Sequence, residues 1–346
     1  MMEPDSTPNP EAPAPAPKRR RRRFRAALSL RAMMLLVLVV GGWTGWQVHR
    51  ARAVRRAIRV IEAAGGSVDF EGSRDAAGHR ITRPRVAAWL CDTLGEEYVF
   101  DVSSVHINHL EPNSDARRVI EAIASIPRVK RLSFLYFVLG DEDMAEIAGM
   151  ADLEEIRIWG QLPSMIRPGS RAAVRPLSPS GLARLSRLRK LRSIRLELES
   201  GQIDAHALDA MSTLPHLRVL EIRGGDPLDD AEVQALGGFK HLEELDIRWF
   251  RPFEPGRTVR PLPIASWAGL RSLTLWFIWL SPDEVRAVSR LGKLERLNCS
   301  EFRDGDLPLL RGMKGLKKLI LNRWNRIKPE SLAPLKAALP GLTIVY

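Results

Sequence analysis

The stretch LRVLEIRGGDPLDDAEVQALGGFKHLEELDI, residues 217–247, decides the fold because it contains one complete structural unit and the start of the next. Apolar residues stand at Leu217, Leu220 and Ile222, and the same spacing returns at Leu242, Leu245 and Ile247. Alternating apolar and polar side chains are typical of a short strand with one buried face. Each unit is therefore predicted to be a strand, a turn and a helical return.

The same spacing recurs along most of the chain. Apart from one interval of 38 residues, the copies are about 25 residues apart, within the 20–29 residues of leucine-rich repeats. The helical returns, for example residues 141–148 and 281–288, begin with acidic or serine residues that cap helices. The other copies begin at Val102, Val129, Leu153, Leu191, Leu270, Leu294 and Leu316, with a truncated copy at Leu342.

These repeats predict an α/β leucine-rich-repeat solenoid over residues 102–346. We expect a right-handed horseshoe with one parallel sheet on its concave face and helical or irregular returns outside. Residues 67–101 do not fit the repeat, and we predict that they form an N-terminal cap, with a strand near Val68 and one short helix near Trp89. Residues 342–346 would close the other end.

The charge is concentrated at the N-terminus. The chain has a net charge of +12, and residues 1–59 hold 13 basic residues against three acidic ones. The repeats are therefore nearly neutral, which argues against a nucleic-acid partner. Only two cysteines, Cys91 and Cys299, are present, which excludes a disulfide framework or a cysteine-built zinc site. No metal-ligand or nucleotide-binding motif occurs, so we expect no metal and no cofactor.

The N-terminal part indicates a membrane anchor. Residues 1–25 are predicted to be a disordered basic tail. Residues 32–48 contain no charged side chain. Residues 26–49 are long enough for a transmembrane helix, with Trp43 and Trp46 near one end. The basic tail favours a cytoplasmic N-terminus and extracytoplasmic repeats in a single-pass inner-membrane protein.

We expect the anchor to remain uncleaved. The small residues of Ala51-Arg52-Ala53 lie too far from the apolar run and among too many arginines for a signal-peptidase site. Residues 50–66 are predicted to be a juxtamembrane helix, with Val54, Ile58 and Ile61 on one face. Its arginines indicate a solvated face on a stalk, with a lipid-surface role as the alternative.

The chain resembles bacterial leucine-rich-repeat proteins held by an N-terminal signal anchor, over residues 24–346. The motifs that carry the resemblance are GGWTGWQV at 41–48, AIRVIEAAGGSV at 57–68, WLCDTLGEEY at 89–98 and RDGDLPLL at 303–310. The resemblance implies a scaffold without known catalysis.

The turn that follows each strand departs from the pattern of this family. The family often has Asn or a small polar residue there, whereas this chain has mostly larger side chains. We therefore expect apolar packing along the turn edge. The positions are Leu110, Phe137, Gln161, Glu199, Gly225, Phe250, Ile278, Phe302 and Trp324.

Polar residues between the apolar strand positions should line the concave face. Aligning the repeats gives one row Arg195–Glu221–Asp246 and a second row Glu197–Arg223–Arg248, which Trp159 and Trp276 bracket. Arginines and aromatic residues dominate binding energies at interfaces. The predicted binding residues for a protein or glycan partner at the cell envelope are Trp159, Arg195, Glu221, Arg223, Asp246, Arg248 and Trp276.

Two alternatives remain open. Glu221 and Asp246 on neighbouring strands would lie near the carboxylate separation of retaining glycosidases, so an envelope glycoside hydrolase is the second hypothesis. An open, arginine-rich face argues against it, and we assign no catalytic residue.

The insertions 159–181 and 249–267 are rich in arginine and aromatic residues. They are either binding loops over the same edge or ordinary variation in loop length.

Overall fold

The computed structural model describes residues 30–72, 85–108, 115–160, 177–248, 261–278, 280–300, 302–321, 325 and 327–345. The chain divides into two compact units, residues 1–47 and residues 48–346. Helix α1, Leu30–Ala63, runs from the first unit into the second.

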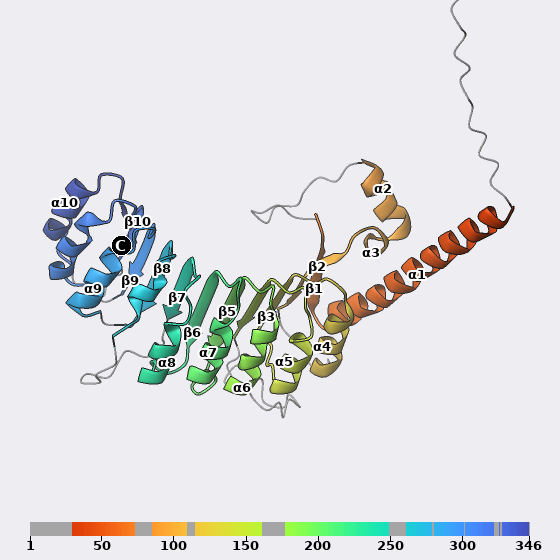
Figure 1. Ribbon diagram of the computed structural model, residues 1–346, viewed down its shortest axis with the longest axis horizontal. Helices are drawn as coiled ribbons and strands as arrows, with labels where there is room; N and C mark the ends of the chain where they lie inside the picture. The colour runs from red at the N-terminus through yellow and green to blue at the C-terminus, as the bar shows by residue number, and fades with distance from the viewer. Residues whose placement is uncertain are drawn as a thin grey trace, which may run out of the picture. The chain divides into compact units, whose positions relative to one another are not determined.

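The second unit is built on one 11-stranded sheet whose strands follow chain order (Figure 1). Every strand from β2 to β11 pairs in parallel with the next, whereas β1 pairs with β2 in antiparallel fashion. The strands are β1 Gly66–Phe70, β2 Val102–Ile107, β3 Arg131–Leu135, β4 Glu155–Trp159, β5 Ser193–Leu198, β6 Val219–Gly224, β7 Glu244–Arg248, β8 Ser272–Trp276, β9 Arg296–Cys299, β10 Lys318–Ile320 and β11 Thr343–Val345.

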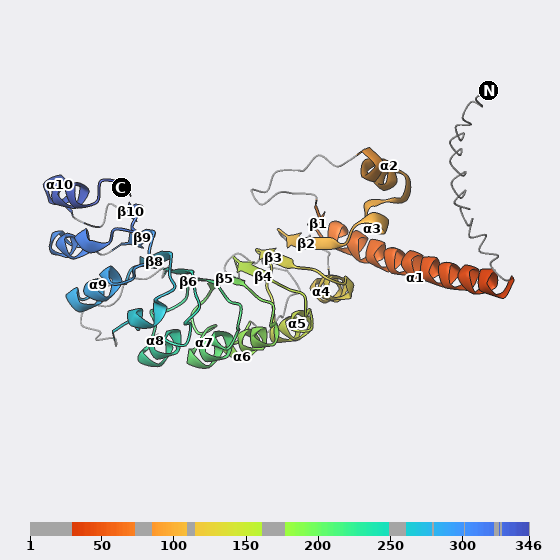
Figure 2. The same ribbon diagram turned by 45° about the horizontal axis from the view of Figure 1, so that its top comes forward.

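The returns between strands are short helices. Figure 2 shows the strands along the inner side of a curved stack and the helices along its outer side. This arrangement confirms the predicted leucine-rich-repeat solenoid. The α-helical returns are α4 Ala116–Ser125, α5 Asp141–Ile147, α6 Pro179–Ala183, α7 Ala205–Ser212, α8 Asp230–Leu236, α9 Pro282–Ser289 and α10 Pro329–Ala338, and the 3-10 returns are η2 Arg184–Arg187, η3 Ile264–Trp267 and η4 Asp304–Gly312.

Side-chain caps start five of the seven described α-helical returns, as the sequence predicts. The Ser281 side chain accepts a hydrogen bond from the Glu284 backbone, and the Glu284 carboxylate accepts one from the Ser281 backbone at 2.7 Å. Such a reciprocal pair satisfies two backbone donors at the helix start. The return that holds most of the motif 303–310 is the 3-10 helix η4, with Pro308 inside it.

The core is a stack of equivalent apolar side chains, one set from each repeat. Leu220, Leu245, Leu273 and Leu297 occupy the same template position on four consecutive strands, and all are fully buried. Burial of one such leucine contributes about 1.5–3 kcal/mol. The repeated spacing therefore builds one continuous core.

The segment between β1 and β2 contains more helix than the sequence predicts. It forms two helices, α2 Arg85–Leu94 and α3 Glu96–Val99, where one was predicted. The C-terminal part of α1 packs against the solenoid: Val54, Ile58 and Ile61 join the hydrophobic core, and Ile61 is 0% exposed. The predicted stalk is wrong here, because the apolar face of this segment packs against the solenoid while its arginines stay solvated.

The predicted tail, residues 1–25, and the first four residues of the predicted membrane span, residues 26–29, lie outside the described residues. Within α1, the apolar side chains from Met33 to Val40 are exposed. Among the helices the structure describes, none combines the length and apolarity needed to cross a bilayer.

The turn edge follows the prediction at three of its five described positions. Phe137, Ile278 and Phe302 are buried against the core, whereas Glu199 and Gly225 are half-buried and contribute no apolar side chain to it. Leu110, Gln161, Phe250 and Trp324 lie outside the described residues. Cys299 is buried in β9 and Cys91 is half-buried in α2, so the two cysteines lie on elements at different ends of the chain order.

Candidate binding face

The strand register brings the predicted binding residues together as aligned rows. Arg195 lies beside Glu221, and Glu221 lies beside Asp246. In the second row, Arg223 and Arg248 are neighbours, and Arg248 is paired with Trp276. The apolar residues between them point into the core, so these polar side chains occupy the opposite face of the sheet.

Glu221 is the centre of an ion-pair network on this face. Its side chain is 10% exposed, and its carboxylate contacts the guanidinium groups of Arg195, at 3.3 Å from Nε to Oε2, and Arg223. Arg195 also donates a hydrogen bond of 2.5 Å to Glu155 on β4. The network links three neighbouring strands and fixes the positions of its arginines.

Asp246 and Arg248 form a second, separate pair. Arg248 donates from Nε and a terminal nitrogen to both carboxylate oxygens of Asp246, at 2.7 and 2.6 Å. These hydrogen bonds raise the pKa of Arg248. The Arg248 guanidinium lies over the Trp276 ring at 5.2 Å, and the Trp276 indole donates to Asn298 at 3.3 Å. Trp276 is therefore held in place from both sides of its strand.

Trp159, on β4, contacts two arginines. The guanidinium groups of Arg157 and Arg223 lie 5.0 and 4.9 Å from its ring centroid. Arg223 is on β6, so it reaches Trp159 across the intervening strand β5. Such cation–π contacts stabilise by about 0.5–2 kcal/mol, depending on desolvation.

Arg157 also belongs to this cluster, although the predicted binding residues do not include it. Its only sequence signal is its place two residues before Trp159 on the same strand. In the structure, Arg157 Nε, Arg223 Nε and Trp159 Nε1 are all buried with no hydrogen-bond partner. A buried donor without an acceptor costs about 1–3 kcal/mol.

The hypothesis of a carboxylate pair for hydrolysis meets a specific obstacle. Glu221 and Asp246 are register neighbours, as the hypothesis requires. However, three arginines engage their oxygens, and a substrate would have to displace those contacts. The face therefore offers a rigid charged surface rather than accessible acid and base groups.

Most of the two insertions, residues 161–176 and 249–260, lies outside the described residues. Trp267 is the last residue of the insertion 249–267 and of η3, and it is buried. Its indole donates to the Leu236 carbonyl at 3.1 Å. Trp267 therefore fills the core, and of the two alternatives for this insertion it does not support a binding role at this residue.

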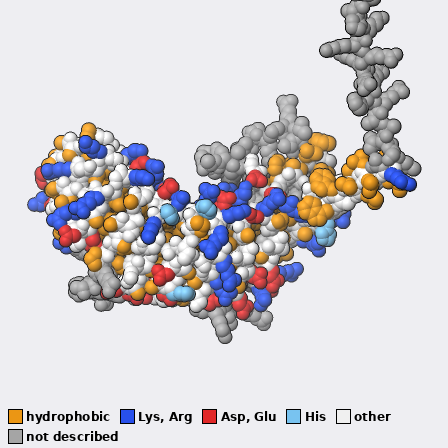
Figure 3. All heavy atoms as spheres, in the orientation of Figure 1, with side chains coloured by type: hydrophobic (Ala, Val, Ile, Leu, Met, Phe, Trp, Pro, Cys, Tyr) orange, Lys and Arg blue, Asp and Glu red, His pale blue; other side chains and the backbone are white. Residues whose placement is uncertain are grey.

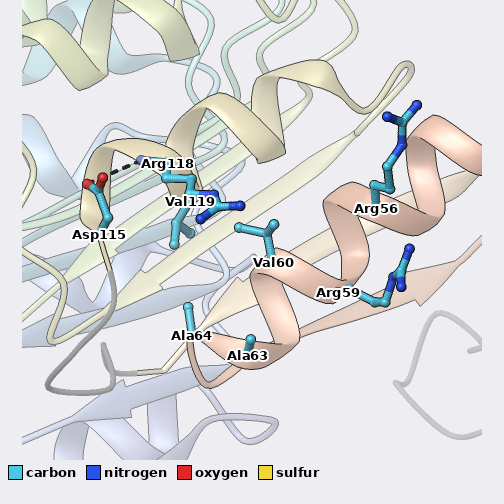
Figure 4. A pocket seen from close by; sticks show the side chains of 8 residues that line it. All are labelled: Arg56, Arg59, Val60, Ala63, Ala64, Asp115, Arg118 and Val119. Carbon is cyan, nitrogen blue, oxygen red and sulfur yellow. Dashed lines mark hydrogen bonds between the residues drawn. The ribbon is translucent and has the colours of Figure 1, made fainter.

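Two cavities are open at the surface of the solenoid unit. One, of about 490 Å³, lies between α1 and α4 and has Val60 and Val119 among its lining residues, with Arg56, Arg59 and Arg118 at its rim (Figure 4). The other, of about 370 Å³, is lined by charged side chains that include Arg271, Glu295 and Lys317. Among the described residues, no cluster of potential metal ligands is present.

Charges of both signs are intermingled on the solenoid (Figure 3).

His106, on β2, lies next to the binding face, with its Nε2 3.4 Å from the Asp69 carboxylate. Burial lowers the pKa of His106, the nearby Arg131 and Arg157 act in the same direction, and Asp69 opposes them.

No protein-family model matches the chain, and no curated protein matches it. Among solved structures, the TLR13–ssRNA13 complex is 18% identical with a TM-score of 0.43, covering 70% of this chain and 32% of that one. The chain thus spans about a third of that protein. An internalin from Listeria monocytogenes is 13% identical with a TM-score of 0.41, covering 75% and 94%.

A leucine-rich-repeat protein from Leptospira interrogans is 14% identical with a TM-score of 0.26, covering 69% of this chain and 93% of that one. Because these TM-scores are low, the assignment of the fold is based on the repeat pattern and on the parallel sheet of this chain.

Proposed function

We propose that the protein is a non-enzymatic scaffold that binds a protein partner on the strand face of its leucine-rich-repeat solenoid. The observation that carries this is the aligned set of arginines and tryptophans on β4 to β8, centred on Arg248 and Trp276. Arginine and tryptophan are the residues that contribute most to binding when an interface buries them.

Preorganisation supports the same conclusion. Asp246 holds Arg248 with two hydrogen bonds, and Asn298 holds Trp276 with one. A side chain that is already fixed loses little conformational entropy when a partner binds. The face therefore suits specific recognition of a protein surface.

The binding role is tested by proximity labelling in the native cell, followed by affinity measurement with the captured partner. Removal of an interface hot spot costs about 2 kcal/mol or more, so Trp276→Ala should weaken binding about thirtyfold. Trp89→Ala is the matched control, because Trp89 is an exposed tryptophan in the cap. Unchanged affinity in both Trp276→Ala and Arg248→Ala, with the fold intact, would refute the assignment of the site.

Anchoring in the inner membrane, with the repeats outside, is part of the proposal. Its support is the charge-free run 32–48 behind a basic tail, together with the exposed apolar side chains from Met33 to Val40. Protease added to intact spheroplasts should digest the repeats. Protection of the repeats would contradict the orientation, and recovery of the full chain in the soluble fraction would contradict the anchor.

A second candidate, glycoside hydrolysis, is favoured only by the neighbouring positions of Glu221 and Asp246. A turnover assay on envelope glycans decides it, with Glu221→Gln as the comparison. Glycan cleavage that disappears in Glu221→Gln would replace the scaffold proposal with this one. We expect no turnover by either form.

A further inference from the structure

Helix α2 presents an apolar face that the folded chain leaves largely exposed. The Trp89 side chain is 62% exposed and that of Leu94 is 52% exposed. At 100° per residue, Trp89, Leu90 and Leu94 fall within about 140° of the helix circumference. Thr93 lies in the same sector, and its hydroxyl already donates to the Trp89 carbonyl at 2.8 Å, so this hydroxyl needs no water.

The stability of α2 also points to a cover for this face. The helix has ten residues, and an isolated helix of this length is only marginally stable in water. Among residues 88–94, whose side chains the structure describes, none is buried. A surface outside the chain that covers the apolar face would therefore stabilise the helix as well.

Two ion pairs fix the position of this segment along α1. The Asp101 carboxylate accepts a hydrogen bond from Arg50 at 2.6 Å, and the Glu97 carboxylate on α3 lies 3.3 Å from Arg55 Nε. The predicted membrane span ends directly before Arg50, and Arg55 lies about 8 Å further along the helix. Leu94 precedes Glu97 by three residues, a reach of about 11 Å at most. The end of α2 is therefore within reach of a headgroup layer about 5–7 Å thick.

The neighbouring charges favour phospholipid over a second copy of the chain. Arg52, Arg56 and Arg59 lie on the same stretch of α1 and are exposed. Within the part of the chain that the structure describes, no carboxylate pairs with them, so they are available to headgroup phosphates. A symmetric contact between two copies would instead bring these like charges together. Tryptophan is also the side chain most typical of the membrane interface.

We propose that α2 is a second membrane contact, which lies in the interface of the membrane that holds α1. Trp89 and Leu94 are then located at the boundary between headgroups and acyl chains. This rests on the proposed anchoring and goes beyond it, because it assigns a phospholipid-binding surface to the folded unit itself. An interfacial helix binds through its buried apolar area together with attraction between nearby cations and anionic lipid.

The test uses the full chain in nanodiscs of phosphatidylcholine and phosphatidylglycerol, with one chain in each disc. An environment-sensitive fluorophore is attached through Leu94→Cys or, as the matched control, through Asp92→Cys, each combined with Cys91→Ala. Cys299 is buried and stays unlabelled. Positions 92 and 94 are both exposed but lie about 160° apart around the helix.

The two labels should respond in opposite ways. The label at position 94 should be quenched by phosphatidylcholine that carries a nitroxide near its headgroup, and it should be protected from iodide in the water. The label at position 92 should be quenched by iodide and not by the nitroxide lipid.

Hydrogen exchange in the same nanodiscs tests the contribution of the tryptophan. Trp89→Ala should make the amides of α2 exchange about tenfold faster or more, because a large apolar side chain no longer contacts lipid. Alanine is a better helix former than tryptophan, so without a lipid contact this variant should exchange at the same rate or more slowly. Tyr136→Ala removes an aromatic side chain that is 53% exposed on the solenoid and should leave α2 unchanged.

Several results would overturn the lipid contact. They are equal iodide quenching at positions 92 and 94, no nitroxide quenching at position 94, or unchanged or slower exchange in Trp89→Ala. Protection of position 94 that appears only in vesicles holding several chains would assign the face to a second copy. A chain that stays in the membrane fraction and binds its partner through Trp276 while α2 fails these tests would lose this contact alone. Recovery of the chain in the soluble fraction would instead mark the failure of the proposed anchor.

Discussion

A glycine at the start of β1 provides a sharp test of how α1 is attached to the solenoid. Gly66 faces Ile107 of β2 in the strand register. A methyl group added at Gly66 would lie 2.6 Å from Ile107 Cδ1, 2.7 Å from Ile61 Cγ2 and 3.0 Å from the Ile61 carbonyl oxygen. Non-bonded carbon atoms pack at about 3.5–4.0 Å, so Gly66→Ala is too close by about 1 Å on two sides.

The magnitude follows from the burial of the two isoleucines. Both are 0% exposed and cannot move into solvent. Overpacking of this kind costs about 1–3 kcal/mol, while the reduced entropy of the unfolded chain returns about 0.4–1 kcal/mol. Gly66→Ala should therefore lower the local unfolding free energy by about 1–2 kcal/mol.

Hydrogen exchange on the full chain measures this effect strand by strand. Amides of β1 and β2 should exchange about 5- to 30-fold faster in Gly66→Ala, and those of β8 to β10 should not change, because solenoid repeats interact with their nearest neighbours. Gly292→Ala is the matched control. It has nothing within 4 Å of the added carbon, so it should be neutral or stabilise by up to about 1 kcal/mol. Equal or greater protection of β1 and β2 in Gly66→Ala would refute the packing of Ile61 against the sheet.

Three other outcomes are expected. Leu245→Ala should lower the unfolding free energy by about 2–5 kcal/mol in a denaturant titration, because the side chain is 1% exposed, and a loss below about 1 kcal/mol would contradict the continuous core. Ser281→Ala should cost about 1 kcal/mol, visible as faster exchange in the first turn of α9, whereas unchanged exchange there would show that the cap is not formed. The free energy of unfolding should fall as the pH decreases from 6.5 toward the lowered pKa of His106, since the unfolded chain then binds the proton more tightly. His106→Gln should flatten that interval, and an identical pH profile in this variant would exclude His106 as the cause.

The strands could be predicted from the sequence because their signal is local. Each repeat places apolar residues at fixed spacing, and burial of Leu220, Leu245 and Leu273 follows directly from it. The register followed as well, since equal template positions align across a parallel sheet. The adjacency of Glu221 and Asp246 was therefore predictable without any structure.

The features that could not be predicted depend on contacts between distant residues. Arg223 reaches Trp159 across β5, and nothing in either repeat indicates that contact. The burial of Trp267 was missed because an aromatic residue in a long insertion looks the same whether it anchors the loop or binds a ligand. Gly65, with a φ of 87°, lies between the end of α1 and the start of β1, and the antiparallel pairing of β1 with β2 has no signal in the repeat pattern.

The two ends of the sheet determine whether copies of the chain could join into a fibre. A stack of parallel strands has two open edges, and an open edge is a template for another molecule. At one end, the pairing of β1 with β2 is irregular between Asp69 and Phe70, which twists the outer edge away from a flat pairing geometry. At the other end, β11 has three residues and offers few backbone groups for pairing. Elongation by strand addition is therefore unfavourable at both edges, so the same repeat that lengthens the sheet within one chain does not extend it from one molecule to the next.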